Sequence, residues 1–318
     1  MYQSILQLFP ATERSFFEYI ASREQYITEI RLRCEKPILV MESEKEWFLN
    51  RNGAYTNILS EAILMKADIL ARIVQHICNY SRYAFEEEIK KGFITVAGGH
   101  RVGLVGQVVT ENGGEIRTIK HISGLNIRVA HQKKGVGQKV LPCLYKGGAV
   151  RSTLIVSPPG CGKTTLLRDL IRYISNGNEY APGQTVGVVD ERSEIAGAYL
   201  GQPQNDMGMR TDVLDACPKV SGMMLLLRSM SPKVIAIDEL GSLSEMAAVS
   251  TVSNCGVKVL ATMHAESLED LQRREGMNVL LEQKRFEVIL LLDKAGGKYS
   301  IKAMYEYGEK GEWKCCDY

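Results

Sequence analysis

The stretch SPPGCGKTT combines the residue types that bind a nucleotide phosphate. Gly160 and Gly162 leave the backbone N–H groups free to curl around phosphate oxygens. Lys163 adds a mobile positive charge, and the hydroxyl of Thr164 is a natural ligand for Mg²⁺. Ser157 stands where a phosphate loop usually begins with glycine. The residues expected to bind nucleotide are Ser157, Pro158, Pro159, Gly160, Cys161, Gly162, Lys163, Thr164 and Thr165.

A pair of carboxylates follows a second apolar run, VIAIDE, over residues 234–239. Asp238 would hold Mg²⁺ directly or through water, and Glu239 would polarise the attacking water. Parallel sheets bind ligands at the carboxyl ends of their strands, so we expect Asp238 and Lys163 to share one crevice. An apolar run followed by Asp-Glu is common by itself, but here a phosphate loop precedes it.

A charged segment, VVDERSEIAG, occupies residues 188–197. It places Asp190, Glu191, Arg192 and Glu194 at another strand end. Strand ends often carry only a solvated charge cluster. A position beside the phosphate loop favours a role in water positioning or subunit contact, with Glu191 as a candidate catalytic residue.

Two further side chains are candidates for contact with phosphate. His264 ends a strand in TMHA, within expected reach of a γ-phosphate, where it could act as a sensor; the alternative is a structural histidine. Arg228 lies in LLLRSMSP, in a largely apolar helix, and an arginine in that setting needs an anionic partner. A nucleotide phosphate or an acidic side chain would serve.

The elements that must position these residues alternate along the second half of the chain. Residues 153–156 read as a strand, followed by the Gly/Pro turn and then by apolar residues at helical spacing. Short apolar runs recur at 185–190, 234–238 and 258–263, with helices between them. This alternation predicts a parallel sheet covered on both faces. Residues 285–292 and 298–305 read as a closing hairpin.

The first 130 residues predict a different, smaller α+β domain. Helical spacing occurs within 1–30 and again over 62–80 and 81–90, and strands are expected within 29–41 and 47–58. A glycine-rich β-meander follows over 92–109 and continues to 126–130. Glycines 135, 137, 147 and 148 indicate a linker over 131–150. The prediction is a RecA-like P-loop NTPase core over 151–318, with the α+β domain before it.

Composition and charge exclude some classes of protein. The chain has 318 residues, 45% hydrophobic and 24% charged, which is typical of globular domains. The net charge of +2 decides nothing about nucleic acid. However, residues 116–168 hold ten Lys or Arg and no Asp or Glu. That stretch could face an anion or an acidic partner, or could simply be the interdomain connection and the phosphate loop.

The cysteines and the apolar runs predict a cytoplasmic protein. None of the eight cysteines forms a C-x-x-C pair, so the sequence has no zinc signature and fits a reducing compartment. The N-terminus lacks signal-peptide character. No apolar run approaches the ~20 residues of a membrane-spanning helix, so membrane association would come through a partner or a surface.

The order SPPGCGKTT, VVDERSEIAG, LLLRSMSPKVIAIDELG, ATMHAES resembles the secretion-superfamily ATPases. These are the hexameric motors of type II and type IV secretion and of type IV pili. DERSEI matches that family's acidic "Asp box" and TMHA its "His box". LRSMSPKV resembles its Leu-Arg-x-x-Pro-Asp segment, with lysine in place of the aspartate. The resemblance implies ATP and Mg²⁺ as cofactors.

A closer resemblance, to a sporulation branch of these ATPases, covers most of residues 29–275. It rests on EIRLRCEKPI, VAGGHRVGLVG, ISGLNIRVA and RTDVLDACPKVSGMMLLLRSMSP. It implies an ATPase of the mother cell, peripheral at the cytoplasmic face of a membrane. There it would power a secretion-like channel toward the forespore, with membrane-embedded secretion-like sporulation proteins as partners.

The same resemblance implies a homo-oligomeric ring, probably a hexamer, whose N-terminal domains reach a neighbour's nucleotide. Arg101, Arg117 and Arg128 are the candidate arginines for that contact. Alternatively, each of them pairs with an acidic residue of its own domain. The acidic residues considered for that alternative are Glu86, Glu87, Glu88 and Glu115.

Two other classes of function compete with the motor. RecA-like folds also serve nucleic-acid-dependent ATPases, but such proteins interleave aromatic residues with basic ones. Tyr145 is the only aromatic residue in the acid-free stretch, so we expect no stable nucleic-acid partner. An inactive P-loop scaffold is the third class. The presence of Lys163, Thr164, Asp238 and Glu239 together argues against it.

Overall fold

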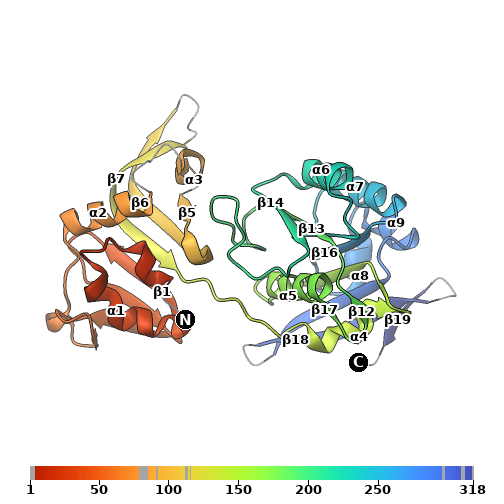
Figure 1. The fold of residues 1–318 in the computed structure, drawn as a ribbon, viewed down its shortest axis with the longest axis horizontal. Helices are drawn as coiled ribbons and strands as arrows, with labels where there is room; N and C mark the ends of the chain where they lie inside the picture. The colour runs from red at the N-terminus through yellow and green to blue at the C-terminus, as the bar shows by residue number, and fades with distance from the viewer. Residues whose placement is uncertain are drawn as a thin grey trace. The chain divides into compact units, whose positions relative to one another are not determined.

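The computed structural model describes residues 4–78, 85–90, 92–111, 114, 116–295, 298–308 and 312–316. The chain divides into two compact units, residues 1–131 and 132–318 (Figure 1). Each unit is organised around one large β-sheet. This is the predicted α/β class, with a smaller α+β unit first and the P-loop unit second.

The first unit contains a seven-stranded antiparallel sheet in the order β4-β3-β2-β1-β7-β6-β5. Ile30 and Leu32 of β1 are buried at alternate positions, after a register irregularity that follows the buried Ile27, and one apolar stripe of α2 is buried. The strands are β1 (Ile27–Arg33), β2 (Leu39–Glu42), β3 (Lys45–Leu49), β4 (Tyr55–Thr56), β5 (Phe93–Thr95), β6 (Arg101–Thr110) and β7 (Ile116–Arg128). The α-helices are α1 (Arg14–Ser22), α2 (Ala67–Ile77) and α3 (Glu86–Lys90).

The helix predicted over 62–80 begins only at Ala67. Leu64 and Met65 instead form isolated β-bridges with Pro37 and Cys34, which hold the preceding backbone in an extended conformation. Residues 79–80 of that prediction lie outside the described residues, as do residues 81–84 of the helix predicted over 81–90, of which the structure shows Glu86–Lys90 as α3.

The second unit contains an eight-stranded sheet in the order β14-β13-β15-β16-β10-β17-β18-β19. The strands from β14 to β17 in this order are parallel, and β18 and β19 are antiparallel, so the predicted hairpin does close the sheet. The strands are β10 (Thr153–Ser157), β13 (Val186–Asp190), β14 (Thr211–Asp215), β15 (Val234–Ile237), β16 (Lys258–His264), β17 (Val288–Ala295), β18 (Lys298–Tyr307) and β19 (Trp313–Cys316).

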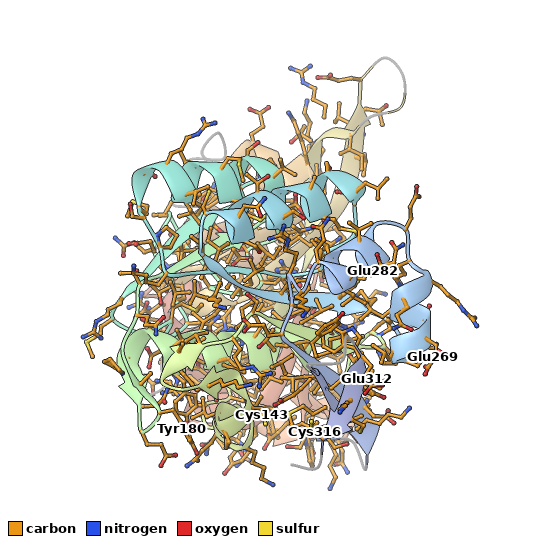
Figure 2. All side chains as sticks on the ribbon, turned by 90° about the vertical axis from the view of Figure 1, so that its right-hand side faces the viewer. Cys143, Tyr180, Glu269, Glu282, Glu312 and Cys316 are labelled. Carbon is orange, nitrogen blue, oxygen red and sulfur yellow. The ribbon has the colours of Figure 1, made fainter. Side chains whose placement is uncertain are left out.

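Helices cover both faces of this sheet and build two hydrophobic clusters. Helix α5 contributes Leu166 and Leu170 to one face, while α6 and α7 contribute Leu226 and Val249 to the other. Helices α6 and α7 lie side by side (Figures 1 and 2). The helices are α5 (Lys163–Asn176), α6 (Lys219–Ser229), α7 (Leu243–Asn254), α8 (Leu268–Arg273) and α9 (Met277–Glu282). Within the described ranges, every helix is too short or too polar to cross a membrane.

The segment over 131–150, predicted to be a linker, is largely packed into the second unit. It forms the short helix α4 (Leu141–Leu144) and a hairpin of β8 (Tyr145–Lys146) and β9 (Ala149–Val150). Leu141 and Leu144 are buried in the same cluster as α5. The N–H of Gly137 donates to Asp169 Oδ2 over 2.8 Å, and a Cβ at Gly137 would lie 2.7 Å from Leu170. This glycine therefore marks a close approach to α5.

The chain is held on both sides of the boundary between the units. On the first side, His131 Nε2 lies 2.6 Å from the carbonyl oxygen of Ile27. On the second side, Gln132 exchanges hydrogen bonds of 2.8 and 2.9 Å with the backbone of Asp206, and Lys134 Nζ lies 2.6 Å from its carboxylate. The junction between residues 131 and 132 is therefore short.

Candidate functional site: a phosphate loop and its carboxylates

The phosphate loop connects the buried strand β10 to the first residue of α5. Gly160 and Gly162 have φ angles of 75° and 84°, in the left-handed region that favours glycine. The loop therefore turns as the glycine spacing predicts, and it delivers the N-terminus of a long helix to the carboxyl edge of the sheet. Unpaired N–H groups at such a terminus attract anions.

Lys163 lies folded against the loop that precedes it. Its ammonium is 3.2 Å from the carbonyl oxygens of Ser157 and Pro158, 3.2 Å from Ser157 Oγ and 3.0 Å from His264 Nδ1. Burial lowers the pKa of Lys163, and the nearby Asp238 carboxylate opposes that shift. The serine that replaces the usual glycine thus supplies one more oxygen to the lysine.

Asp238 joins the phosphate loop to the neighbouring strands through two hydroxyl groups. Thr164 Oγ1 donates to Asp238 Oδ2 over 2.6 Å, and Thr262 Oγ1 donates to the other carboxylate oxygen. This hydroxyl–carboxylate pair has the hard oxygen donors that Mg²⁺ prefers. The described residues contain no cluster of three or more His, Cys, Asp or Glu placed to hold a metal. Mg²⁺ here would take its other ligands from phosphate and water.

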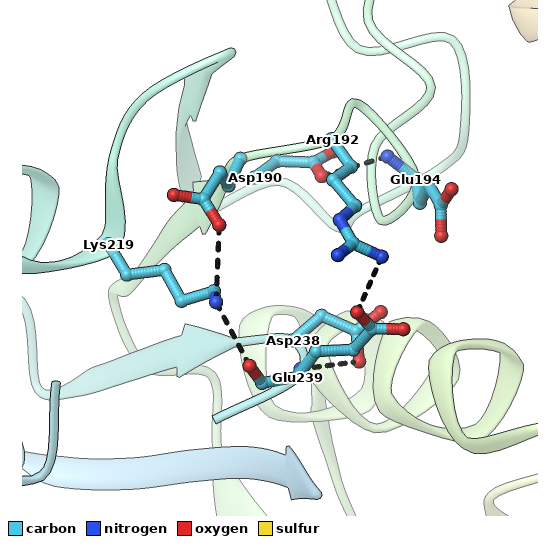
Figure 3. A pocket seen from close by; sticks show the side chains of 7 residues that line it. Asp190, Arg192, Glu194, Lys219, Asp238 and Glu239 are labelled. Carbon is cyan, nitrogen blue, oxygen red and sulfur yellow. Dashed lines mark hydrogen bonds and ion pairs between the residues drawn. The ribbon is translucent and has the colours of Figure 1, made fainter. Parts of the chain in front are cut away.

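Glu239 has a φ angle of 54°, which is uncommon for a residue with a Cβ. Its main chain is held on both sides: the N–H donates to Thr262 Oγ1 over 2.9 Å, and the carbonyl accepts from Lys219 Nζ over 2.9 Å. Its carboxylate lies 2.6 Å from Arg192 and 3.4 Å from His264 Nε2. Figure 3 shows Arg192 reaching toward this carboxylate.

His264 lies between the two halves of the site. Its Nδ1 faces the ammonium of Lys163, which can only donate, and its Nε2 faces the carboxylate of Glu239, which accepts. A neutral ring with its proton on Nε2 satisfies both contacts. The imidazole therefore connects the lysine of the phosphate loop to Glu239.

The charged segment after β13 has two separate roles. Asp190 is buried, and its carboxylate accepts from the N–H groups of Glu194, Ile195 and Ala196 over 2.8 to 3.0 Å. Burial raises the pKa of Asp190 in spite of these three donors. This carboxylate closes a turn, whereas the carboxylate of Glu191 lies 3.2 Å from Lys219 Nζ. The candidate catalytic residue Glu191 thus contacts a lysine.

One pocket opens between the end of β15 and the loop after β13 (Figure 3). It is lined by Asp190, Glu191, Arg192, Glu194, Lys219, Asp238 and Glu239. The structure therefore brings together the carboxylates that the motifs predict, and it places them beside the phosphate loop through the contact of Thr164 with Asp238.

The structure does not bring Arg228 to this pocket. Arg228 is exposed in the last turn of α6. The chain next enters the start of β15, so Arg228 lies at the opposite edge of the sheet from the phosphate loop. The expectation that Arg228 needs an anionic partner is wrong because its side chain leaves the apolar face of the helix. Met223 and Leu226 occupy that face instead.

The candidate arginines of the first unit lie on its two long strands. Arg101 stacks on the ring of Phe93 at 4.6 Å, and Arg117 lies 3.8 Å from Glu111, which is not one of the expected acidic partners. Arg128 is exposed on β7 and opposite Arg101 in register. Glu115 lies outside the described residues.

Three side chains that shape the site were not singled out from the sequence. Lys219 contacts Glu191, Glu239 and Glu245, and Thr262 holds both Asp238 and Glu239. Arg168 donates to the carbonyl oxygens of Glu194 and Ile195. For Lys219 the sequence held one signal. Proline often lies at the start of a helix, so Pro218 indicates that Lys219 stands in the first turn of α6.

A model of the family described as "Sporulation stage III, protein AA" matches residues 1–313. The chain belongs to this family. "Stage III sporulation protein AA" from Bacillus subtilis (strain 168) is 41% identical over 280 residues, which are 88% of this chain and 87% of that protein. The resemblance to the sporulation branch is therefore confirmed for this member of the sporulation stage III protein AA family.

Solved structures confirm the fold predicted for this family member. The "Legionella pneumophila ATPase DotB" matches with a TM-score of 0.60 and 12% identity, over 94% of this chain and 81% of that one. The "Pilus Retraction Motor PilT and Bound ADP" also matches with a TM-score of 0.60, at 16% identity, over 91% and 81% of the two chains. The chain thus has the α/β fold of these secretion ATPases.

Proposed function

We propose that this protein binds ATP with Mg²⁺ and hydrolyses it. The observation that carries the proposal is the linked set of contacts from Lys163 through His264 to Glu239, beside the pair of Thr164 and Asp238. A phosphate-binding lysine, two oxygen donors for Mg²⁺ and a separate carboxylate are the parts that phosphoryl transfer requires.

Each residue would have one task in the reaction. Lys163 and the N–H groups at the start of α5 hold the β- and γ-phosphates and stabilise their charge. Thr164 and Asp238 hold Mg²⁺, which neutralises charge between those phosphates when it is bound. Glu239 orients the attacking water and accepts its proton as the water oxygen bonds to the γ-phosphorus. The bond from that phosphorus to the bridging oxygen breaks, giving ADP and phosphate.

ATP hydrolysis by this protein would power a process in sporulation. Membership of the sporulation family supports a role in sporulation, and the fold shared with secretion ATPases supports a motor. We place the protein in the mother cell, peripheral at the cytoplasmic face of the membrane. There a homo-oligomeric ring, a hexamer by analogy with secretion motors, would power a secretion-like channel through membrane-embedded partners.

The function is tested by the steady-state ATPase rate of the full chain with Mg²⁺. The assay is repeated with single-stranded DNA, with RNA, and with membranes from sporulating cells. We expect measurable hydrolysis that neither nucleic acid increases and that the sporulation membranes stimulate. Stimulation by DNA or RNA alone would support a nucleic-acid-dependent ATPase instead. A chain that binds ATP without turnover would contradict the enzyme assignment.

Ring assembly predicts that active sites are completed by a neighbouring subunit. A subunit with Lys163→Ala is mixed with one in which Arg101, Arg117 and Arg128 are all alanine. We expect each variant to be inactive alone and the mixture to recover ATPase activity. At some interfaces the triple-arginine variant supplies an intact Lys163, and the Lys163→Ala subunit supplies the intact arginines. An arginine of this kind stabilises charge on the transferred phosphoryl group and contributes ~10³-fold or more in rate.

Arg51→Ala is the matched control for the mixing experiment, because Arg51 is an exposed arginine of the same unit outside the candidate set. Light scattering with ATP reports the assembly state of every sample. A triple-arginine variant with full activity alone, or a wild-type chain that stays monomeric with ATP at high concentration, would contradict the ring mechanism.

A further inference from the structure

Lys219 is a buried lysine whose ammonium connects three elements at the carboxyl edge of the sheet. Its Nζ lies 2.9 Å from the carbonyl oxygen of Glu239, 3.2 Å from Glu191 Oε2 and 2.9 Å from Glu245 Oε1. Its side chain is only 10% exposed. An ammonium has three N–H donors, so these contacts use its full capacity. Figure 3 shows it between the end of β15 and the loop after β13.

The charge of Lys219 is maintained in spite of its burial. Burial lowers the pKa of Lys219, but the hydrogen bonds that its ammonium donates to Glu245 and Glu191 outweigh that effect and raise the pKa above its usual value. Glu245 is itself fixed, because its other carboxylate oxygen accepts from the N–H groups of Gly241 and Ser242 in the capping box of α7. The lysine therefore bonds to a rigid support on that side.

The contact with Glu239 is made to its main chain and not to its carboxylate. Glu239 has a positive φ angle, and a residue in that conformation keeps it only where surrounding contacts determine it. Thr262 holds the N–H of Glu239 and Lys219 holds its carbonyl. These two contacts set the direction in which the carboxylate leaves the backbone.

We propose that Lys219 is a positioning residue that fixes the Glu239 backbone and that Glu191 acts through Lys219, not on the attacking water. This inference rests on the proposed ATPase function and deepens it. It assigns the glutamate of the DERSEI segment to the support of Glu239. The exposed carboxylate of Glu191 helps to fix the position of the Lys219 ammonium, and that ammonium donates to the carbonyl oxygen of Glu239.

Lys219→Met tests the proposal, because methionine keeps the length of the side chain and removes all three donors. We expect kcat to fall by ~10²-fold, the scale expected when a reacting group is misplaced by about 1 Å. The Kd for ATP, measured with a fluorescent analogue, should stay within about threefold, because Lys219 contacts none of the residues assigned to phosphate. Lys219→Arg should recover part of kcat, since a guanidinium can donate to the same oxygens.

Lys258→Met is the matched control. Lys258 Nζ pairs with Glu287 over 2.7 Å, but it lies at the start of β16, at the opposite edge of the sheet. Its loss should leave kcat unchanged. Thermal unfolding of each variant separates altered geometry from loss of the fold. If Lys219→Met is too unstable to assay, Lys219→Arg and Glu191→Gln carry the same comparison.

The double variant separates an indirect role of Glu191 from a direct one. Glu191→Gln alone should lower kcat less than Lys219→Met does, and adding it to Lys219→Met should lower kcat no further. A full effect of Glu191→Gln in the Lys219→Met background would overturn the proposal, as would wild-type kcat in Lys219→Met or an equal loss of ATP binding. A wild-type chain without turnover would refute the ATPase function and this inference together.

Discussion

Replacing Lys163 by alanine should abolish useful ATP binding, raising the Kd by ~100-fold or more. The ammonium would lose about two charge-assisted hydrogen bonds to phosphate, each worth at least about 1.5 kcal/mol. In the structure the same ammonium bonds to the carbonyl oxygens of Ser157 and Pro158 at 3.2 Å. A phosphate oxygen carries a negative charge, so it would be a stronger acceptor for this ammonium than a carbonyl oxygen is. Isothermal titration with ATP and Mg²⁺ measures the change.

The fold should survive this substitution. Burial lowers the pKa of Lys163, which means that the protein interior disfavours its charge, so a neutral side chain costs the core little. The midpoint of thermal unfolding reports this directly. Lys233→Ala is the control, because Lys233 is an exposed lysine just before β15. If Lys163→Ala binds ATP as tightly as the wild type, this loop is not the nucleotide site.

Replacing Glu239 by glutamine should retain binding of ATP and Mg²⁺ but lower turnover by ~10²-fold or more, as expected for a positioned acid–base group. The amide has nearly the shape of the carboxylate but cannot accept a proton from water. The main chain of residue 239 keeps its bonds to Thr262 and Lys219, so the geometry should persist. Single-turnover hydrolysis, measured beside ATP affinity, separates the chemical step from binding.

Glu282→Gln makes the same chemical change on the exposed surface of α9 (Figure 2) and should leave both quantities unchanged. Near-normal turnover in Glu239→Gln would move the catalytic role to Glu191 or Glu194. Asp238→Asn provides a contrast at the adjacent position. It should weaken the dependence on Mg²⁺, because Asp238 bonds to the hydroxyl of Thr164 and Glu239 does not.

Local patterns predicted the parts of the site that lie next to strand ends. Glycine spacing fixed the turn of the phosphate loop, and strand alternation implied that Asp238 would meet the loop, as its contact with Thr164 now illustrates. The role of Lys219 could not be predicted from local patterns. Its partners Glu191, Glu239 and Glu245 come from three separate segments, and only the folded sheet brings them to one ammonium.

Two sequence-based interpretations failed for related reasons. Arg228 follows several apolar residues, but helical geometry turns it to solvent while its neighbours on the other face are buried. Glycines 135, 137, 147 and 148 predicted a linker over 131–150, because glycine favours loops. Gly137 instead permits close packing on α5, and Leu141 and Leu144 bury the segment. Burial of a few apolar residues outweighed the local preference.

The short junction at residues 131 and 132 has a mechanical consequence. Because His131 is bonded to Ile27 and Gln132 to Asp206, almost no slack chain separates the units. Any change in the orientation of one unit against the other must therefore be taken up by the few backbone dihedral angles at residues 131 and 132. On the side of the second unit, the hydrogen bond from Gly137 to Asp169 fixes the segment that follows this junction to α5, the helix that begins at the phosphate loop.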